Sequence, residues 1–158
     1  MVQGRYAEAV PLLEEGVALK PSPAPHLLLS YGVVNLGWAR LGLDELGGAR
    51  DAFRRAYAEA GSGDRQISAR ALDALATVAV RQGDAHRGAL LFGAAEGIRR
   101  SIGVEVWVTD AAGHDRAEAA MRAALGDEAF RAAVEAGLHL TAEVIVSIAF
   151  AGGAGQPA

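Results

Sequence analysis

Residues 4–16 read GRYAEAVPLLEEG, and the same spacing of small and apolar residues returns at 46–56 (LGGARDAFRRA) and 83–95 (GDAHRGALLFGAA). The small residues at the matching positions, Ala9, Ala49 and Gly88, lie 40 and 39 positions apart. Each is followed four residues later by a large apolar residue, and three residues further on by a second small one: Leu13 and Gly16, Phe53 and Ala56, Phe92 and Ala95. A recurrence of about 20 to 50 residues is typical of stacked helical repeats, which bind partners along a surface. The pattern therefore predicts a recognition surface rather than an active site.

The composition favours helices and a single core. Of the 158 residues, 51% are apolar but only 6% are aromatic, and alanine, the best helix former, supplies much of the apolar share. The absence of cysteine excludes disulfides and thiolate metal sites. A net charge of −4 argues against broad attraction to nucleic acid, and the longest apolar run, 144–151, is too short to span a bilayer. We expect a cytoplasmic protein that binds neither nucleic acid nor membrane directly.

Apolar periodicity and turn residues place the elements along the chain. They predict helices at 4–19, 26–41, 44–60, 66–81, 85–101, 114–125, 127–137 and 141–150. Asp44 and Thr141 are the predicted N-caps of the third and the last of these helices. Residues 20–25 (KPSPAP) form the predicted linker, 103–113 an extended loop that anchors Trp107 on the helices, and 152–158 a flexible tail.

The repeated segments resemble the second helix of the tetratricopeptide repeat, Gly-x-Tyr-x-x-Ala-x-x-x-Phe/Leu-x-x-Ala with a proline five residues later. The matching residues are Gly4, Tyr6, Ala9, Leu13, Gly16 and Pro21; Leu36, Gly37, Ala49, Phe53 and Ala56; and Leu75, Ala76, Gly83, Gly88, Phe92 and Ala95. This resemblance implies an all-α fold, a right-handed α-solenoid of helical hairpins over residues 1–102 in which the first hairpin is incomplete. Residues 114–151 would then form a C-terminal helical cap that covers the last hairpin.

A second resemblance covers residues 85–150. Residues 87–103, RGALLFGAAEGIRRSIG, are similar to the segment A-A-R-L-L-G-A-A-E-A-L-R-E-x-I-G, and residues 124–143 to its usual continuation. That block typifies the C-terminal repeat region of large actinobacterial ATP-dependent regulators, including LuxR-type and SARP-type transcription factors. The resemblance implies a non-catalytic interaction or sensor module, covalently linked in a longer chain to ATPase and DNA-binding domains. This sequence contains neither a P-loop nor a helix-turn-helix, so ATP hydrolysis and DNA binding are not carried over.

The chain opens on the second helix of a hairpin. Either Met1 is a misplaced start or, as we favour, the chain is a fragment of a longer regulator. The alternative is a stand-alone adaptor that scaffolds a protein complex. The absent first helix would leave the apolar side of helix 4–19 exposed, and this predicts self-association through that helix.

In the tetratricopeptide-repeat family the first helices of the hairpins line a concave groove that receives a protein or peptide partner. Carried over by position, the resemblance implies a partner groove made of Tyr31, Asn35, Trp38, Arg70, Asp73, Thr77 and Arg81. Asn35 matches the asparagine that some members use to hold a peptide backbone, whereas the lysines of the chaperone-binding clamp are missing. For Trp38 two interpretations stay open, a place in the groove and simple packing in the core.

No residue pattern points to catalysis or to a cofactor. The sequence lacks HExxH and GxSxG, and residues 61–65 (GSGDR) lack the spacing and the lysine of a P-loop. Asp110 and His114 are either ligands on one helix face or, more simply, part of a solvated loop-to-helix cap. Gly93 and Gly97 either imitate a membrane dimer motif or, as we favour in a soluble hairpin, allow close packing of neighbouring helices. We therefore expect no catalytic, cofactor-binding or metal-binding residues.

Overall fold

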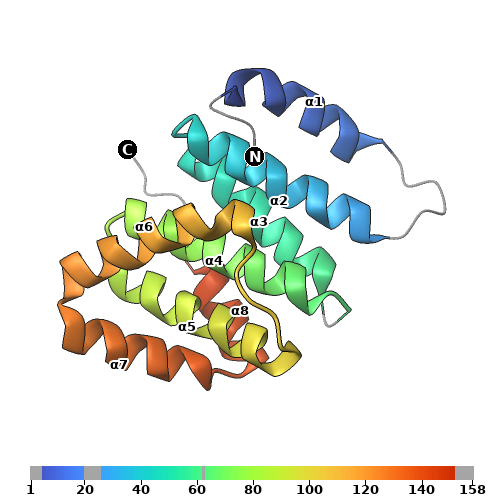
Figure 1. Cartoon of the computed structure of the whole chain (residues 1–158). Coiled ribbons are helices and arrows are strands. Elements are labelled where there is room, and N and C mark those ends of the chain that lie inside the picture. Colours follow the sequence, from blue (N-terminus) through green and yellow to red (C-terminus); the bar gives the residue numbers. More distant parts are fainter. Residues whose placement is uncertain (1–4, 20–25, 62, 152–158) are drawn as a thin grey trace.

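The computed structural model describes residues 5–19, 26–61 and 63–151 (side chains of 26–29 excepted), and in these residues it contains eight α-helices and no strand (Figure 1). They are α1 (Tyr6–Ala18), α2 (His26–Gly42), α3 (Leu46–Ala60), α4 (Arg65–Arg81), α5 (Ala85–Ile102), α6 (Val108–Leu125), α7 (Asp127–Leu138) and α8 (Ala142–Phe150). The predicted all-helical class is confirmed. The predicted linker 20–25 and tail 152–158 lie outside the described residues.

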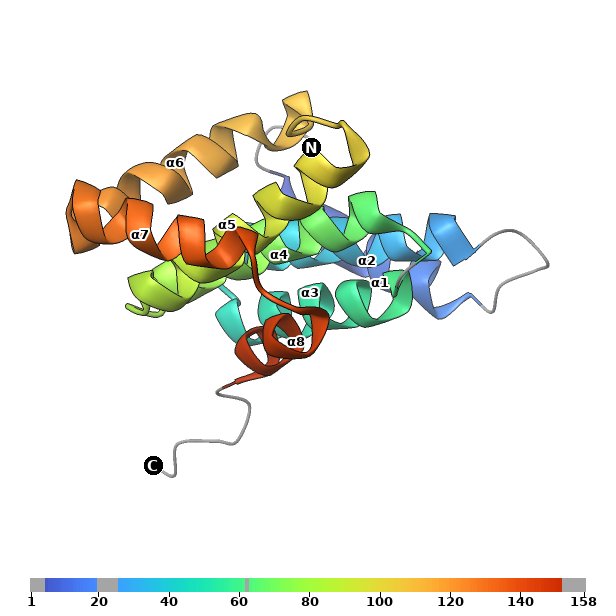
Figure 2. The same ribbon diagram turned by 90° about the horizontal axis from the view of Figure 1, so that it is seen from below.

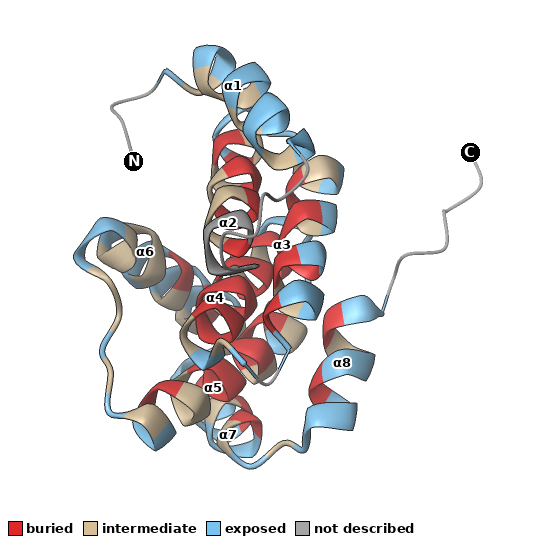
Figure 3. Cartoon of the chain, turned by 90° about the vertical axis from the view of Figure 1, so that its right-hand side faces the viewer, coloured by how far each residue is buried: buried red, intermediate tan, exposed pale blue. Residues whose placement is uncertain are grey.

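Helices that follow one another in the sequence pack side by side from α1 to α5, and α7 packs against the far side of α5. Figure 2 shows α6 and α8 on opposite faces of the layer that α2 to α5 form. Figure 3 shows α4 buried along most of its length in the middle of this arrangement. The fold therefore has a central row of helices, with one C-terminal helix covering each face.

The recurring positions of the sequence lie in the core of this row. Ala49, Phe53 and Ala56 on α3 are fully buried, as is Ala95 on α5. Burial of a phenylalanine side chain contributes about 1.5–3 kcal/mol relative to leaving it exposed. In α1 the same positions are only half-buried or exposed, and no residue of this helix is buried. The repeat thus stabilises α3 and α5 more strongly than α1.

Glycines allow α5 and α7 to approach closely. A Cβ atom added at Gly93 would lie 2.1 Å from the carbonyl oxygen of Val134, and one added at Gly137 would lie 2.3 Å from that of Leu90. At Gly97 the distance to the carbonyl oxygen of Leu138 would be 2.9 Å. This confirms close helix packing as the role of the Gly93 and Gly97 pair.

Two local predictions are wrong and one is confirmed. Asp44 does not cap α3, because it adopts a left-handed φ of 66° in the turn after α2, and Glu45 takes the N-cap position without a side-chain bond. Residues 108–113 are not loop but the first turns of α6, where Asp110 suits the positive end of the helix dipole. Thr141 caps α8 as predicted, since its side chain accepts a hydrogen bond from the Val144 N–H.

The last helix is fastened to α3 by an arginine. Arg54 donates from Nε to the carbonyl oxygen of Ala149 at 2.9 Å and from Nη2 to that of Ala151 at 2.7 Å. The carbonyl groups at the end of a helix have no partner within the helix, so this guanidinium satisfies two of them. Burial lowers the pKa of Arg54, and the neighbouring Arg50 adds to this lowering.

Candidate functional site

The chain itself covers half of the predicted partner groove. Trp107, which precedes α6, stacks on Tyr31 of α2 with ring centroids 5.5 Å apart. The guanidinium of Arg70 on α4 lies over the Trp107 ring at 4.5 Å from its centroid. These contacts hold Trp107 on the helices, as predicted, although the extended loop that carries it ends before Val108 and not at residue 113.

An ion pair between α4 and α6 completes this cover. Arg70 donates from Nε to Oδ2 of Asp110 at 2.7 Å and from Nη2 to Oδ1 at 3.3 Å, and the two side chains are only 9% and 14% exposed. Such bidentate, charge-assisted pairs are short and directional. Burial raises the pKa of Tyr31 beside this pair; the carboxylate of Asp64 adds to the rise and Arg70 opposes it. The space left between α4 and residues 104–107 amounts to about 10 Å³, so this half of the groove is filled.

Further along α4, Asp73 also faces inward. It accepts a hydrogen bond from Nη1 of Arg99 on α5, and its Oδ1 lies 3.6 Å from Nδ1 of His114 on α6. The His114 ring stacks on Phe92 with centroids 4.3 Å apart. Asp110 and His114 therefore do not form a solvated cap, because α4 and α5 cover both. Within residues 5–19, 26–61 and 63–151 no group of three or more His, Cys, Asp or Glu side chains could hold a metal ion.

Glu96 supports this cluster from α5. It accepts hydrogen bonds from Arg99 at 3.1 Å and from Arg100 at 2.7 Å. Burial raises the pKa of Glu96, but the hydrogen bonds from Arg100 and Arg99 outweigh burial and leave it below its usual value. A carboxyl group whose folded-state pKa is lowered stabilises the fold above its unfolded pKa, near 4.3, and this stabilisation is lost as the pH falls through the folded pKa.

Replacement of Glu96 by glutamine is therefore expected to lower the free energy of unfolding by about 1 kcal/mol at neutral pH and to have little effect near pH 3. Urea unfolding of both proteins at the two pH values measures the difference. Glu59→Gln serves as the control, because its exposed pair with Arg55 contributes about 0.5 kcal/mol or less. Equal losses for Glu96→Gln at both pH values would contradict the expectation.

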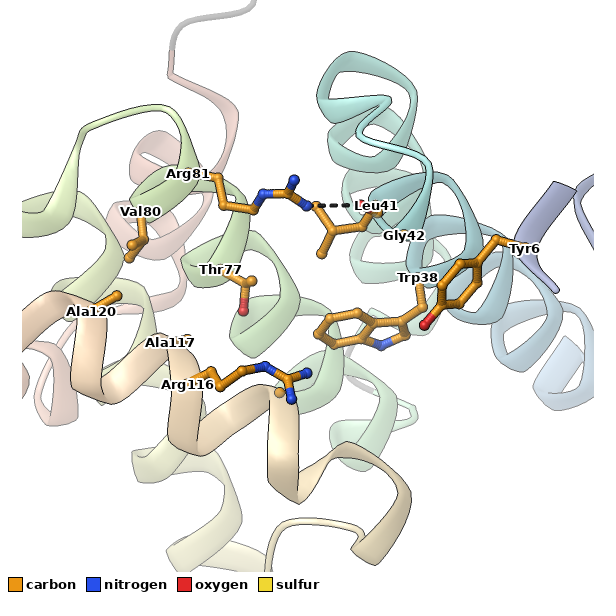
Figure 4. Close-up of a pocket in the computed structure, with 11 residues that line it drawn as sticks. Tyr6, Trp38, Leu41, Gly42, Thr77, Val80, Arg81, Arg116, Ala117 and Ala120 are labelled. Atoms are coloured by element: carbon orange, nitrogen blue, oxygen red, sulfur yellow. Dashed lines mark hydrogen bonds between the residues drawn. The ribbon is translucent and has the colours of Figure 1, made fainter. Parts of the chain in front are cut away.

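The other half of the predicted groove is open. A pocket of about 330 Å³ lies between α1, α2, α4 and α6 (Figure 4). Its lining contains three of the predicted groove residues together with side chains from α1 and α6: Trp38, Thr77 and Arg81, then Tyr6, Leu41, Gly42, Val80, Gly113, Arg116, Ala117 and Ala120. A neighbouring space of about 180 Å³ shares Tyr6, Trp38, Gly113 and Arg116 with this pocket. Together they form a cleft along α6, which we call the α6 cleft.

Trp38 both packs against the core and lines the cleft, so it fits both interpretations of its position. Its ring packs edge-on against the buried Phe53, with centroids 5.4 Å apart, and it also lines the α6 cleft. Its Nε1 is buried and has no hydrogen-bond partner among the described residues. A buried donor without a partner costs about 1–3 kcal/mol. The indole N–H is therefore an unsatisfied donor in the wall of the cleft.

The two arginines of the cleft differ in their partners. Arg81 donates from Nη1 to the carbonyl oxygen of Leu41 at 2.8 Å and pairs through Nη2 with Oδ1 of Asp44 at 2.5 Å. Arg116 is exposed and forms no hydrogen bond or ion pair with the residues that the structure describes. In Figure 4 its guanidinium extends from α6 toward the indole of Trp38.

The structure thus divides the seven predicted groove residues. Tyr31, Arg70 and Asp73 are engaged by the chain's own C-terminal part, Trp38, Thr77 and Arg81 line the α6 cleft, and Asn35 is half-buried and lines neither space of the cleft. Tyr6 and Arg116 line both spaces of the cleft but are not among the predicted groove residues. The signal for Arg116 was the absence of any carboxylate three or four positions away on its helix, where only Ala112, Gly113, Ala119 and Ala120 occur.

Comparison of the chain with protein-family models, with curated proteins and with solved structures finds no match. In the described part of the chain no helix is both long and apolar enough to cross a membrane.

Proposed function

We propose that this chain is a non-catalytic recognition module of the sensor type, a right-handed α-solenoid of tetratricopeptide-like hairpins with α6 to α8 as its cap. The side-by-side packing from α1 to α5 supports this arrangement, as do the buried repeat positions on α3 and α5. In this proposal α2 and α4 are the first helices of two hairpins, and their shared face is the recognition face.

One observation carries the proposal: α6 lies on the recognition face and leaves a pocket of small-ligand size at one end of it. An extended peptide needs a continuous groove, whereas Trp107 and Asp110 already fill the end at Tyr31 and Arg70. The remaining pocket of about 330 Å³ falls at the small end of the range of about 300–1,000 Å³ typical of small-ligand sites. Its lining offers donors and guanidinium groups but no carboxylate, imidazole or thiol that would act as base or nucleophile.

The module belongs, in this proposal, to a bacterial ATP-binding transcriptional regulator of the LuxR or SARP type. The support is the resemblance over residues 85–150, in which Gly93, Gly97 and Gly137 provide the close contact of α5 with α7. By analogy only, an effector bound in the α6 cleft would change the activity of ATPase or DNA-binding domains in the same chain.

A stand-alone cytoplasmic adaptor is the second candidate, and α1 favours it. Its apolar stripe rests half-buried on α2, but Leu12 is 69% exposed and Leu19, just after the helix, is 66% exposed. Exposed leucines on an outer helix suit a protein partner or a second copy of this chain.

The DNA upstream of the Met1 codon separates the two candidates. A reading frame that continues upstream through a first helix and a GxxxxGK[ST] motif is the expected result for the regulator. A stop codon and a ribosome-binding site close to Met1 would exclude the regulator and leave the adaptor.

A further inference from the structure

The guanidinium of Arg116 on α6 has no hydrogen-bond or ion-pair partner among the described residues. Among the described residues most arginines bind a carboxylate or a carbonyl group, as Arg122, further along α6, binds Glu118 and Asp127. Arg116 has only alanine and glycine three and four positions away, and no side chain of α1, α2 or α4 that the structure describes pairs with it. Its guanidinium offers a planar fork of five N–H donors to the α6 cleft.

The charge around Arg116 favours an anion. No carboxylate lines the 330 Å³ pocket, although the whole chain carries a net charge of −4. Asp110 lines the neighbouring space, but both of its oxygens are bound by Arg70. A negative group that enters the α6 cleft therefore meets a cation without a counter-ion.

The other residues that line the pocket indicate the chemical character of the rest of the ligand. Leu41, Val80, Ala117 and Ala120 and the indole of Trp38 present apolar surface. Trp38 Nε1 adds one buried donor without a hydrogen-bond partner beside this apolar surface. From α6 the 330 Å³ pocket takes only Gly113, Arg116, Ala117 and Ala120, which lie beyond the first turn, where the backbone N–H groups are used within the helix. Asp110, at the start of α6, lines only the neighbouring space, and its N–H donates to the carbonyl oxygen of Trp107, so α6 offers this pocket no row of free N–H groups of the kind that binds a phosphate.

We propose that the α6 cleft binds a small organic carboxylate with an aromatic or aliphatic body, held by bidentate hydrogen bonds from Arg116 beside the indole of Trp38. The body lies against Leu41, Val80 and Ala117. This inference rests on the proposed recognition role and names the ligand class of the same site. In this proposal Arg116, which lies outside the repeat pattern, makes the site prefer a negatively charged ligand.

The test is a titration followed by the indole N–H signals of ¹⁵N-labelled protein, which has two tryptophans. The probes are phenylacetate and hexanoate, with phenylacetamide as the neutral match, each raised to about 10 mM, where millimolar affinities are detected. The Trp38 signal, identified with Trp38→Phe, is expected to shift with both carboxylates. Phenylacetamide is expected to bind the native chain at least about tenfold more weakly than phenylacetate does. Phenylacetate is expected to bind Arg116→Gln with a similar loss of affinity.

Arg122→Gln is the matched control, because it removes a guanidinium from the same helix outside the α6 cleft, and it is expected to bind phenylacetate as the native chain does. The ligand class is overturned if phenylacetamide binds as well as phenylacetate, if Arg116→Gln binds unchanged, if the Trp38 signal stays fixed with every probe, or if tetraglutamate binds more tightly than both carboxylates. Equal binding of the neutral probe would leave the recognition role standing. The upstream reading frame tests the regulator assignment independently of every outcome here.

Discussion

Replacement of Gly93 by alanine is expected to lower the free energy of unfolding by about 3 kcal/mol or more. The added Cβ would lie 2.1 Å from the carbonyl oxygen of Val134 and 2.9 Å from the Cα of Gly137, both of them backbone atoms. A flexible side chain can move away from a new methyl group, but here α7 must shift as a whole. Urea unfolding followed by circular dichroism measures the loss.

Gly16→Ala is the matched control for this substitution. Gly16 lies within α1, and a Cβ added there has no atom within 4 Å. The same chemical change is therefore expected to stabilise the chain by about 0.5–1 kcal/mol, because alanine loses less backbone entropy on folding than glycine. If both variants unfold at the same urea concentration as the native protein, the close packing of α5 on α7 does not exist in solution.

Replacement of Arg70 by methionine is expected to destabilise the docking of α6 on α4 by about 3–5 kcal/mol, because it leaves the carboxylate of Asp110 largely buried without its cation. It also removes the guanidinium that lies over the Trp107 ring. Hydrogen exchange at the first turns of α6 should become much faster than in the native chain, while exchange in α3 changes less.

A second variant distinguishes the ion pair from general packing. In Arg70→Met combined with Asp110→Leu both charges are gone, and most of the lost stability is expected to return. Arg55→Met controls for the loss of an arginine at an exposed i, i+4 pair and is expected to cost about 0.5 kcal/mol or less. A double variant no more stable than Arg70→Met alone would show that the pair does not hold α6.

The local sequence predicted where the helices lie, but it did not predict the geometry of the turn after α2. Apolar spacing located each of the eight helices that the structure describes, since the signal for a helix lies within one or two turns of the chain. Asp44 has the right residue type for an N-cap, but the turn after α2 requires a left-handed residue and Arg81 binds its side chain. The left-handed φ belongs to the local end of α2, where the N–H groups of Asp44 and Glu45 donate to the carbonyl oxygens of Leu41 and Arg40. The arginine that binds the Asp44 side chain lies 37 positions away and is invisible to a local pattern.

Of the candidate site, only the residues on the repeat helices α2 and α4 were predictable from the sequence. The resemblance placed Trp38, Thr77 and Arg81 on one face, and all three line the α6 cleft. It placed Tyr31 and Arg70 there as well, but it contained no information on where the C-terminal helices dock. The position of α6 depends on contacts that Trp107 and Asp110 make with residues far earlier in the chain, and no spacing along the sequence indicates them.

The arginine that fastens α8 has a consequence for the order of folding. Arg54 and Ala149 are separated by 95 positions, so their hydrogen bond closes a very long loop. Long-range contacts form late, because the entropy of loop closure is lost before the contact contributes stability. We therefore expect α3, α4 and α5 to assemble first through near-neighbour contacts, and α8 to dock after the partner on α3 has formed.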